Sequence, residues 1–369
     1  MHITLSANTA WYIWNFRLRL IRELQSDGHR ITVIAPEDHT LERFKNEGIT
    51  FISLPLAAKS RNPLTDLMTY RRYRSIYRSL RPDVCLHWTI KPNLYGSMAA
   101  SALRIPVINN VSGAGTAFSG RGLMFHLVRI LHRLAFSKVS TVFFQNKDDK
   151  ALFESLKLVD SRRSALLPGS GVDIDSFPEL PLPEDPFTFL FVGRMLKQKG
   201  VEILLEAMRL IHPDYPFARL ILLGGHDPDD NLMADEKLVK KAIHEGIAEF
   251  PGMVDDVRPW IKSAHCVVLP SWYREGVPRS LLEAAASGRP LIAADSTGTR
   301  EPVDNSVNGY LCVPRSVEDL ADKMKIMIQS PKSRLSEMAK ASRAMAVQRF
   351  NEQIVINAYR QALAAFCRQ

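Results

Sequence analysis

The chain has 369 residues, carries a formal net charge of +9 and is 46% hydrophobic. These values predict a soluble globular protein with two domains of ordinary size. No apolar run reaches the roughly 18 residues that span a bilayer, and the first residues lack the basic and apolar segments of a secretory signal. The four cysteines form no CxxC pattern, which argues against a disulfide framework or a zinc site and favours the reducing cytoplasm.

The basic charge is concentrated in the first half of the chain. Residues 1–168 hold 24 lysines and arginines against 12 acids, whereas the remainder holds 24 against 27. Such a surplus predicts an anionic partner for the first half: a membrane surface, a phosphate-bearing substrate or nucleic acid. The sequence shows no helix-turn-helix, zinc-finger or RRM pattern, so we expect no nucleic-acid partner.

Apolar, β-branched runs alternate with helical patterns along the first half. The first helix is expected at 15–28, where Gly28 suits a helix end. Strands that alternate with helices predict βαβ units and a parallel, doubly wound sheet. The strands are expected at 2–7, 29–36, 49–56, 83–88, 106–113 and 141–146.

The pattern restarts after residues 167–187, a segment rich in proline, glycine and aspartate that is typical of a linker. The sequence therefore predicts two Rossmann-like α/β domains, 1–168 and 169–350, and a C-terminal helix, 351–369, that can pack back on the first domain. Two such domains leave a cleft along the carboxyl ends of both sheets, where ligands bind. The strands of the second domain are expected at 187–195, 218–225, 266–271, 290–295 and 309–314.

The stretch SWYREGVPRSLLEAAASG (271–288) holds two glutamates around a helix start. Pro278 fits the first turn of a helix, so a helix is expected over about 278–287. Glu275 then lies in the turn before the helix and Glu283 lies inside it. Because the N–H groups of a helix start attract anions, the two acids suit a sugar and a ribose on either side of a phosphate. They also fit a catalytic pair, or two ordinary acids on a helix surface.

A second stretch, FVGRMLKQKG (191–200), brings cations to the end of the first strand of the same domain. Arg194 offers a planar fork for phosphate oxygens and Lys199 a point charge. Together they can hold a diphosphate and stabilise the charge on a departing one. No DxD-like carboxylate pair stands out at a strand end, where VDD at 254–256 comes closest. Neither GxGxxG nor GxxxxGK[ST] follows a first strand, which argues against a dehydrogenase or a P-loop ATPase. We therefore expect no metal and no cofactor.

GRMLKQKG and SWYREGVPRSLLEAAASGRPLIAADSTGTREPVDNSVNGYLCVP together resemble the retaining glycosyltransferases of the GT4 family, which have the GT-B fold. Glu275 and Glu283 match the E-x7-E motif of that family. The resemblance implies that Arg194 and Lys199 bind the donor diphosphate, that Glu275 contacts the donor sugar and that Glu283 contacts the ribose. It also implies donor contacts from the chain at Gly276, Val277, Pro278, Arg279, Ser280 and, toward the base, Met253.

The reaction that the resemblance implies is transfer of a sugar from a nucleotide sugar with retention. In this family no dedicated base is required, since the leaving phosphate can take the acceptor proton on the same face. Glu275 would then act in a positional and electrostatic way, with Arg194 and Lys199 as the catalytic cations.

Segments of the first half are similar to a bacterial subgroup of the family. They are NPLTDL (62–67), HWTIKPNLYGSMAA (87–100) and VSGAGTAF (111–118). That subgroup includes the N-acetylgalactosaminyltransferase that extends undecaprenyl-diphosphate-linked diacetylbacillosamine. The similarity implies a UDP-N-acetylhexosamine donor and a polyprenyl-diphosphate-linked saccharide acceptor, in the assembly of surface or glycoprotein glycans. INNVSGAGTAFSG (108–120) lacks the histidine of many members, so a sugar-contacting histidine is not expected.

Two helical patterns carry many of the arginines of the first half. In YRRYRSIYRSL (70–80) the apolar residues share one face, while Arg71 and Arg72 lie elsewhere and can meet an acceptor diphosphate. In RGLMFHLVRILHRLAF (121–136) apolar residues cover most of the circumference, so this helix is either buried or lies in an interface of anionic lipids. We expect peripheral binding to the inner face of the cell membrane. The polar candidates for acceptor binding at strand ends are Lys91, Asn109, Asn110 and Ser112.

Three alternatives share parts of this pattern. A GT-B sugar-nucleotide epimerase or hydrolase would have the same donor site but would not need a basic, membrane-facing half. A GT4 transferase with a GDP-sugar donor and a soluble acceptor would also have the same fold. An inactive sugar-binding module would have no need of all four charged residues of the two motifs.

Overall fold

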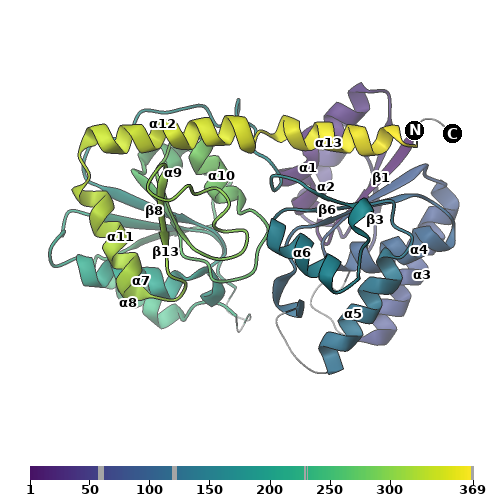
Figure 1. Cartoon of the computed structure of the whole chain (residues 1–369), viewed down its shortest axis with the longest axis horizontal. Helices are drawn as coiled ribbons and strands as arrows, with labels where there is room; N and C mark the ends of the chain where they lie inside the picture. The colour runs from purple at the N-terminus through teal and green to yellow at the C-terminus, as the bar shows by residue number, and fades with distance from the viewer. Residues whose placement is uncertain (57–61, 119–122, 228–229, 231, 367–369) are drawn as a thin grey trace. The chain divides into compact units, whose positions relative to one another are not determined.

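The computed structural model describes the chain except for residues 57–61, 119–122, 228–229, 231 and 367–369. The chain forms two compact units (Figure 1). The first comprises residues 1–170 together with 354–369, and the second comprises residues 171–353. Within the described residues, no helix is both long enough and apolar enough to span a membrane.

The first unit is built on a parallel sheet with the strand order β3-β2-β1-β4-β5-β6-β7. Leu5 of β1 lies opposite Val33 of β2 on one side and Leu86 of β4 on the other. These strands are near-continuous apolar runs because helices cover both faces of the sheet. The strands are β1 (His2–Ser6), β2 (Arg30–Ala35), β3 (Thr50–Ser53), β4 (Val84–Trp88), β5 (Val107–Val111), β6 (Thr141–Phe144) and β7 (Ser164–Leu166).

Two hydrophobic cores form on the two faces of this sheet. One contains side chains of α1 (Ala10–Ser26), α2 (Leu41–Asn46) and α13 (Glu352–Ala364). The helices that contribute to the other are α3 (Pro63–Leu80), α4 (Ser97–Ala102), α5 (Leu123–Phe136) and α6 (Lys147–Ser155). The first helix begins at Ala10 rather than at Asn15, because the Thr9 side chain accepts a hydrogen bond from the N–H of Tyr12 and caps the helix there.

The second unit repeats this architecture with the strand order β10-β9-β8-β11-β12-β13. A single large core contains side chains from its strands and helices. The strands are β8 (Thr188–Val192), β9 (Arg219–Leu223), β10 (Glu249–Gly252), β11 (Cys266–Leu269), β12 (Leu291–Ala294) and β13 (Gly309–Cys312). The helices are α7 (Val201–Ile211), α8 (Glu236–His244), α9 (Arg258–Ser263), α10 (Arg279–Ala286), α11 (Val317–Gln329) and α12 (Lys332–Arg349).

The strands expected from the sequence are confirmed, but two edge strands were missed. β7 has three residues, and β10 contains Pro251 and no alternation of apolar and polar residues. Edge strands pair on one side only and therefore tolerate proline and short length. The periodicity of the sequence consequently gave no signal for either strand.

The order of strands in the second sheet places a switch point between β8 and β11. β8 pairs with β9 on one side and with β11 on the other. The loops that follow β8 and β11 therefore leave the same edge of the sheet and face each other there. In open α/β sheets, ligands bind outside the carboxyl ends of the strands at such a point.

Much of the segment expected as a linker is bound to the second unit. Arg343 Nη1 of α12 donates hydrogen bonds to the carbonyl oxygens of Phe177 and Ala286, at 2.8 and 2.7 Å. The N–H of Val172 donates to the carbonyl oxygen of Phe350 at 2.8 Å. The segment through which the chain enters the second unit thus lies beside the segment through which it leaves that unit.

Candidate active site

A glycine brings the loop after β8 against the end of β11. Gly200 has a φ of +80°, and a Cβ added there would lie 2.9 Å from Cγ of Pro270 and closer still to the carbonyl oxygen of that residue. Only glycine allows both this conformation and this approach. The contact places Lys199 beside the loop that follows β11, which contains Glu275.

Lys199 and Glu275 form an ion pair at the switch point. Lys199 Nζ lies 2.5 Å from Glu275 Oε2, and the two side chains are 19% and 13% exposed. Ser271 Oγ donates a hydrogen bond to Oε1 of the same carboxylate at 2.5 Å. The N–H of Trp272 donates to the carbonyl oxygen of Gln198 at 3.1 Å, so the backbones of the two loops are also joined. Both oxygens of Glu275 are engaged, which suits an electrostatic and positional role.

The loop after β12 supports Glu275 from the other side. Ser296 Oγ donates to the carbonyl oxygen of Ser271 at 2.5 Å, and the N–H of Glu275 donates to the carbonyl oxygen of Thr297 at 3.3 Å. Ser271, Ser296 and Thr297 were not predicted to belong to the site. The signal that could have found Ser271 is its position two residues after a buried strand, on the same loop as Glu275.

The helix that follows Glu275 begins at Arg279, one residue later than expected, and Pro278 is its N-cap residue. Arg279 Nε lies 2.9 Å from Glu283 Oε1, and both side chains are mostly buried. Burial raises the pKa of the Glu283 carboxyl above its usual value, and the neighbouring Arg279 opposes this shift. Among the predicted backbone contacts, the buried residues are Gly276, Val277 and Pro278 and the half-buried ones are Arg279 and Ser280.

Arg194 lies farther out and has a carboxylate partner that was not predicted. Its Nη2 lies 3.2 Å from Oδ2 of Asp230, and the arginine side chain is 58% exposed whereas the aspartate side chain is 7% exposed. Asp230 follows β9 and belongs to no motif that the sequence reveals. Met253 follows β10 and is 64% exposed. Its Sδ lies 3.9 Å from the position of a Cβ added to Gly225, so Met253 lies where β10 and β9 end.

Among the described residues, no group of three or more His, Cys, Asp or Glu side chains is arranged to hold a metal ion. Asp256 of the VDD sequence instead forms an ion pair with Arg258, with Oδ1 and Nε 2.8 Å apart. The charged groups that the structure brings to the ends of β8 and β11 are Arg194, Lys199 and Glu275. This set can hold an anion beside a group rich in hydroxyls.

The predicted acceptor residue Lys91 is already paired within the first unit. Its Nζ lies 2.8 Å from Oδ1 of Asp66 in α3, and the lysine side chain is 7% exposed. Lys91 directly precedes a single π-helical turn, η1 (Pro92–Gly96), after β4. The pair therefore joins α3 to the end of β4, and an acceptor would have to compete with Asp66 for this lysine.

Asn110 and Ser112 are engaged as well. Asn110 is fully buried, and its Nδ2 donates to the hydroxyl oxygen of Tyr359 in α13 at 3.2 Å. Ser112 Oγ donates to Asn110 Oδ1 at 3.2 Å and lies 3.2 Å from the hydroxyl oxygen of Tyr12. Asn109 is also fully buried. Asn109 and Asn110 therefore belong to the interior of the first unit, whereas Ser112 is half-buried, and a role in acceptor binding stays a prediction.

Two helices of the first unit differ in how they use their apolar residues. α3 buries Tyr73 and Tyr77 and exposes Arg71 and Arg72, as its helical period predicted. α5 buries Ala135 and Phe136 against the sheet. Among the α5 side chains whose exposure the structure describes, Leu127, Ile130 and Leu134 are 48–57% exposed, and they lie three and four residues apart on one face. α5 is thus a partly buried helix with an exposed apolar stripe, and its contact with lipid stays a prediction.

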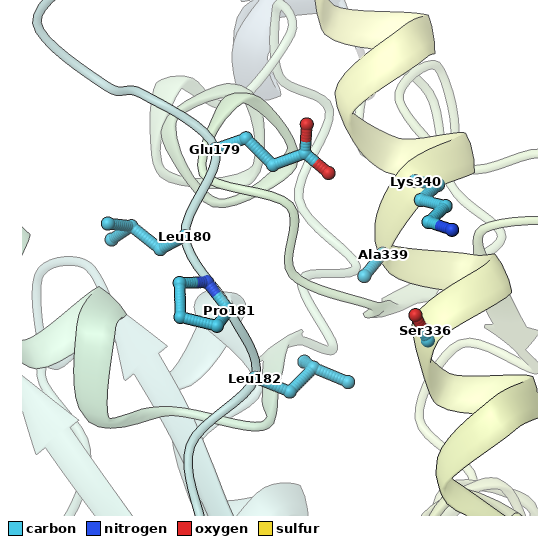
Figure 2. Close-up of a pocket in the computed structure, with 7 residues that line it drawn as sticks. All are labelled: Glu179, Leu180, Pro181, Leu182, Ser336, Ala339 and Lys340. Atoms are coloured by element: carbon cyan, nitrogen blue, oxygen red, sulfur yellow. The ribbon is translucent and has the colours of Figure 1, made fainter.

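A hollow of about 300 Å³ in the second unit lies away from these charged groups. Figure 2 shows it between the segment Glu179–Leu182 and the α12 residues Ser336, Ala339 and Lys340. A Cβ added to Gly288 would lie 3.3 Å from Glu179 Cγ and 3.6 Å from the carbonyl oxygen of Ala339. Gly288 follows the end of α10, so the hollow lies at the opposite end of that helix from Glu275.

Comparisons with known families give matches to both halves of the chain. Residues 186–330 match the family described as "Glycosyl transferases group 1". Residues 13–169 match the family described as "Glycosyl transferase 4-like domain".

Two curated relatives are similar over most of their length. The N,N'-diacetylbacillosaminyl-diphospho-undecaprenol alpha-1,3-N-acetylgalactosaminyltransferase of Campylobacter jejuni is 25% identical over 378 residues, with 97% of each chain covered. The UDP-Gal:alpha-D-GlcNAc-diphosphoundecaprenol alpha-1,3-galactosyltransferase of Escherichia coli is 22% identical, with 89% of this chain and 87% of the relative covered.

Solved structures show the same fold at low sequence identity. Anabaena HepE in complex with UDP and glucose has a TM-score of 0.80 and 18% identity, with 99% of this chain and 100% of HepE covered. WaaG, a glycosyltransferase involved in lipopolysaccharide biosynthesis, has a TM-score of 0.73 and 14% identity, with 98% of this chain and 99% of WaaG covered. The two α/β units are those of the GT-B fold.

Proposed function

Since the chain belongs to the group 1 glycosyltransferases of the GT4 family, we propose that it moves a sugar, with retention, from a UDP-sugar to an undecaprenyl-diphosphate-linked saccharide. The observation that carries this proposal is the Lys199–Glu275 pair at the ends of β8 and β11. The lysine supplies a cation for a diphosphate, and the carboxylate supplies acceptors for sugar hydroxyls. Both are needed where a nucleotide sugar is cleaved.

The donor diphosphate would meet two cations and the start of α10. Lys199 and the exposed Arg194 follow β8, and they stabilise the negative charge that develops on UDP as it departs. The N–H groups at the beginning of α10 lack partners within the helix and attract phosphate oxygens. Glu283, one turn farther along, accepts hydrogen bonds from the ribose in place of its contact with Arg279. HepE, which binds UDP and glucose in its structure, supports a uridine nucleotide.

Retention in this proposal comes from attack of the acceptor on the face that UDP leaves, with Glu275 positioning the sugar. Both of its carboxylate oxygens are engaged, by Lys199 and Ser271, so it orients the sugar and does not attack it. The bond from the anomeric carbon to UDP breaks, and a bond to the acceptor oxygen forms on the same face. The departing diphosphate accepts the proton of the acceptor hydroxyl, and the two cations balance its charge without a metal ion.

The relatives support an acceptor that carries a polyprenyl diphosphate. The names of the Campylobacter and Escherichia coli relatives both specify saccharides linked to undecaprenyl diphosphate. An N-acetylhexosamine is the proposed sugar, because the Campylobacter relative transfers N-acetylgalactosamine and aligns with 97% of this chain. The product would be a lengthened lipid-linked saccharide for a surface or glycoprotein glycan.

The first unit is proposed to bind the membrane that contains this acceptor. Its exposed stripe on α5, Leu127, Ile130 and Leu134, can enter the lipid interface. The exposed Arg133 on the same helix and the excess of 24 basic over 12 acidic residues in 1–168 favour anionic lipids. Arg71 and Arg72 would lie near the acceptor diphosphate. The protein would therefore act peripherally, on the inner face of the cell membrane.

The test is transfer of label from a donor to a lipid acceptor. Purified protein is mixed with radiolabelled UDP-N-acetylglucosamine, UDP-N-acetylgalactosamine or a GDP-sugar, and with anionic liposomes that contain an undecaprenyl-diphosphate-linked saccharide. We expect a UDP-N-acetylhexosamine to label the organic phase and Lys199→Ala to abolish the label. NMR of the product should show the same anomeric configuration as the donor. Free sugar or an epimer without labelled lipid would indicate a hydrolase or epimerase instead. A water-soluble product from a GDP-sugar would indicate a soluble acceptor.

A further inference from the structure

Arg194 and Asp230 form an unequal pair. The arginine side chain is 58% exposed and the aspartate side chain 7% exposed, with 3.2 Å between Nη2 and Oδ2. An exposed arginine side chain samples many rotamers, and it loses conformational entropy when a ligand fixes it in one of them. A buried carboxylate that binds one Nη group restricts the direction of the guanidinium, whose other N–H groups stay available to a ligand.

The backbone around Asp230 fixes its carboxylate. Its Oδ1 accepts a hydrogen bond from the N–H of Leu232 at 3.1 Å, and its carbonyl oxygen accepts one from the N–H of Met233 at 2.9 Å. A side chain that accepts a hydrogen bond from the backbone N–H two residues on is oriented by its own backbone. Asp230 is therefore the fixed member of the pair and Arg194 the adjustable one.

The loop that carries Asp230 is also hydrogen-bonded to the loop that carries Arg194. The N–H of Lys197 donates to the carbonyl oxygen of Leu232 at 3.0 Å, and the N–H of Ala234 donates to that of Met195 at 2.7 Å. Met195 itself donates to the carbonyl oxygen of Gly225 at 3.0 Å. These bonds join the backbone beside Arg194 to the backbone beside Asp230 and so hold the two loops next to each other.

We propose that Asp230 is a positioning residue, which orients the guanidinium of Arg194 for the departing nucleoside diphosphate. The inference rests on the proposed function, because it needs a diphosphate at the end of β8. An unoriented arginine can bind a ground-state diphosphate in several rotamers. The extra charge on the leaving group develops only in the transition state, where a cation already in place is most effective. Loss of the Asp230 charge therefore lowers kcat more than it lowers affinity for UDP.

The main variant is Asp230→Asn, which keeps an oxygen for the N–H of Leu232 and removes the charge. We expect kcat to fall about tenfold, while the Kd of UDP from titration calorimetry changes less than about threefold. In an Arg194→Ala background the same substitution should cause no further loss of kcat, since its effect passes through that arginine. Asp230→Ser, whose hydroxyl can also accept from the turn, serves as a second variant in case the amide destabilises the loop.

A matched control removes another carboxylate that pairs with an arginine in the same unit. Glu249 pairs with Arg219 at the amino ends of β10 and β9, away from the proposed site. Glu249→Gln should therefore leave kcat unchanged.

Three results would contradict the proposal. Tighter UDP binding by Asp230→Asn at unchanged kcat would show that the carboxylate competes with the diphosphate. An equal loss of kcat with and without Arg194 would show that Asp230 acts only on the fold of its loop. Wild-type kcat in both Asp230 variants would overturn this inference alone, whereas a wild-type protein that transfers no sugar would overturn the proposed function together with it.

Discussion

Gly200 allows a test of whether activity depends on the spacing between two loops. A Cβ at this position would lie 2.9 Å from Cγ of Pro270 and closer to its carbonyl oxygen. Since nonbonded heavy atoms need roughly 3.5 Å, an alanine fits only if the loops move apart by about 1 Å. That movement draws Lys199 away from Glu275 without altering either residue, and a misplacement of about 1 Å costs roughly 100-fold in rate. We therefore expect Gly200→Ala to lower kcat about 100-fold.

The matched control is Gly246→Ala in the same unit. Gly246 has a φ of +71°, and no atom lies within 4 Å of an added Cβ. Both variants should share the strain of a left-handed alanine, about 1–2 kcal/mol, and Gly200→Ala should lose further thermal stability because of its contact with Pro270. Steady-state kinetics with the proposed UDP-sugar and lipid-linked acceptor separate the two variants. If both variants kept the same kcat, the contact of Gly200 with β11 would not position the Lys199–Glu275 pair.

Three further substitutions address the other assignments. Glu275→Ala should lower kcat about 100-fold or more but change the calorimetric Kd of UDP less than about threefold, because the proposed contact of this carboxylate is to the sugar; equal losses would contradict that role. Burial raises the pKa of Glu283, so ionisation of this group destabilises the fold as pH rises above the ordinary carboxyl pKa. Glu283→Gln should therefore gain thermal stability relative to wild type between pH 4 and pH 8, and a constant difference would argue against the shift. Ile130→Asp should weaken sedimentation with anionic liposomes about tenfold, whereas Leu210→Asp, at a residue of the second unit that is 52% exposed, should not.

The sequence was sufficient to predict the central strands, because these strands are continuous apolar runs. β4 and β11, for example, were expected at 83–88 and 266–271 and are found at Val84–Trp88 and Cys266–Leu269. Edge strands such as β10 lack a continuous apolar run. They pair with a neighbouring strand on one side only and therefore tolerate polar residues and proline. The start of α1 was missed because Thr9 caps it before an aromatic segment whose period is not obvious.

Only part of the candidate site could be predicted from the sequence. Motifs placed Lys199 and Glu275 on two loops, but their contact depends on the approach of Gly200 to Pro270, which no local pattern encodes. Asp230 could not be found, because its role comes from a buried position opposite Arg194 and not from its neighbours in sequence.

Lys91 was predicted to bind the acceptor because it lies near the end of a strand. That position carries no information about a partner that is distant in the sequence. The structure shows that partner to be Asp66. Position along a strand thus predicts where a polar residue lies, whereas its availability to a ligand depends on the rest of the fold.

The C-terminal helix gives the two units different folding requirements. The ring of Tyr359 in α13 lies 5.7 Å from that of Trp88 and 5.0 Å from that of Phe143, inside the core of the first unit. The first unit is thus made of two stretches of chain separated by the whole second unit, which is continuous. During synthesis, residues 1–170 leave the ribosome well before α13 exists. The second unit can complete its core first, and the unit that is translated first is the one that finishes folding last.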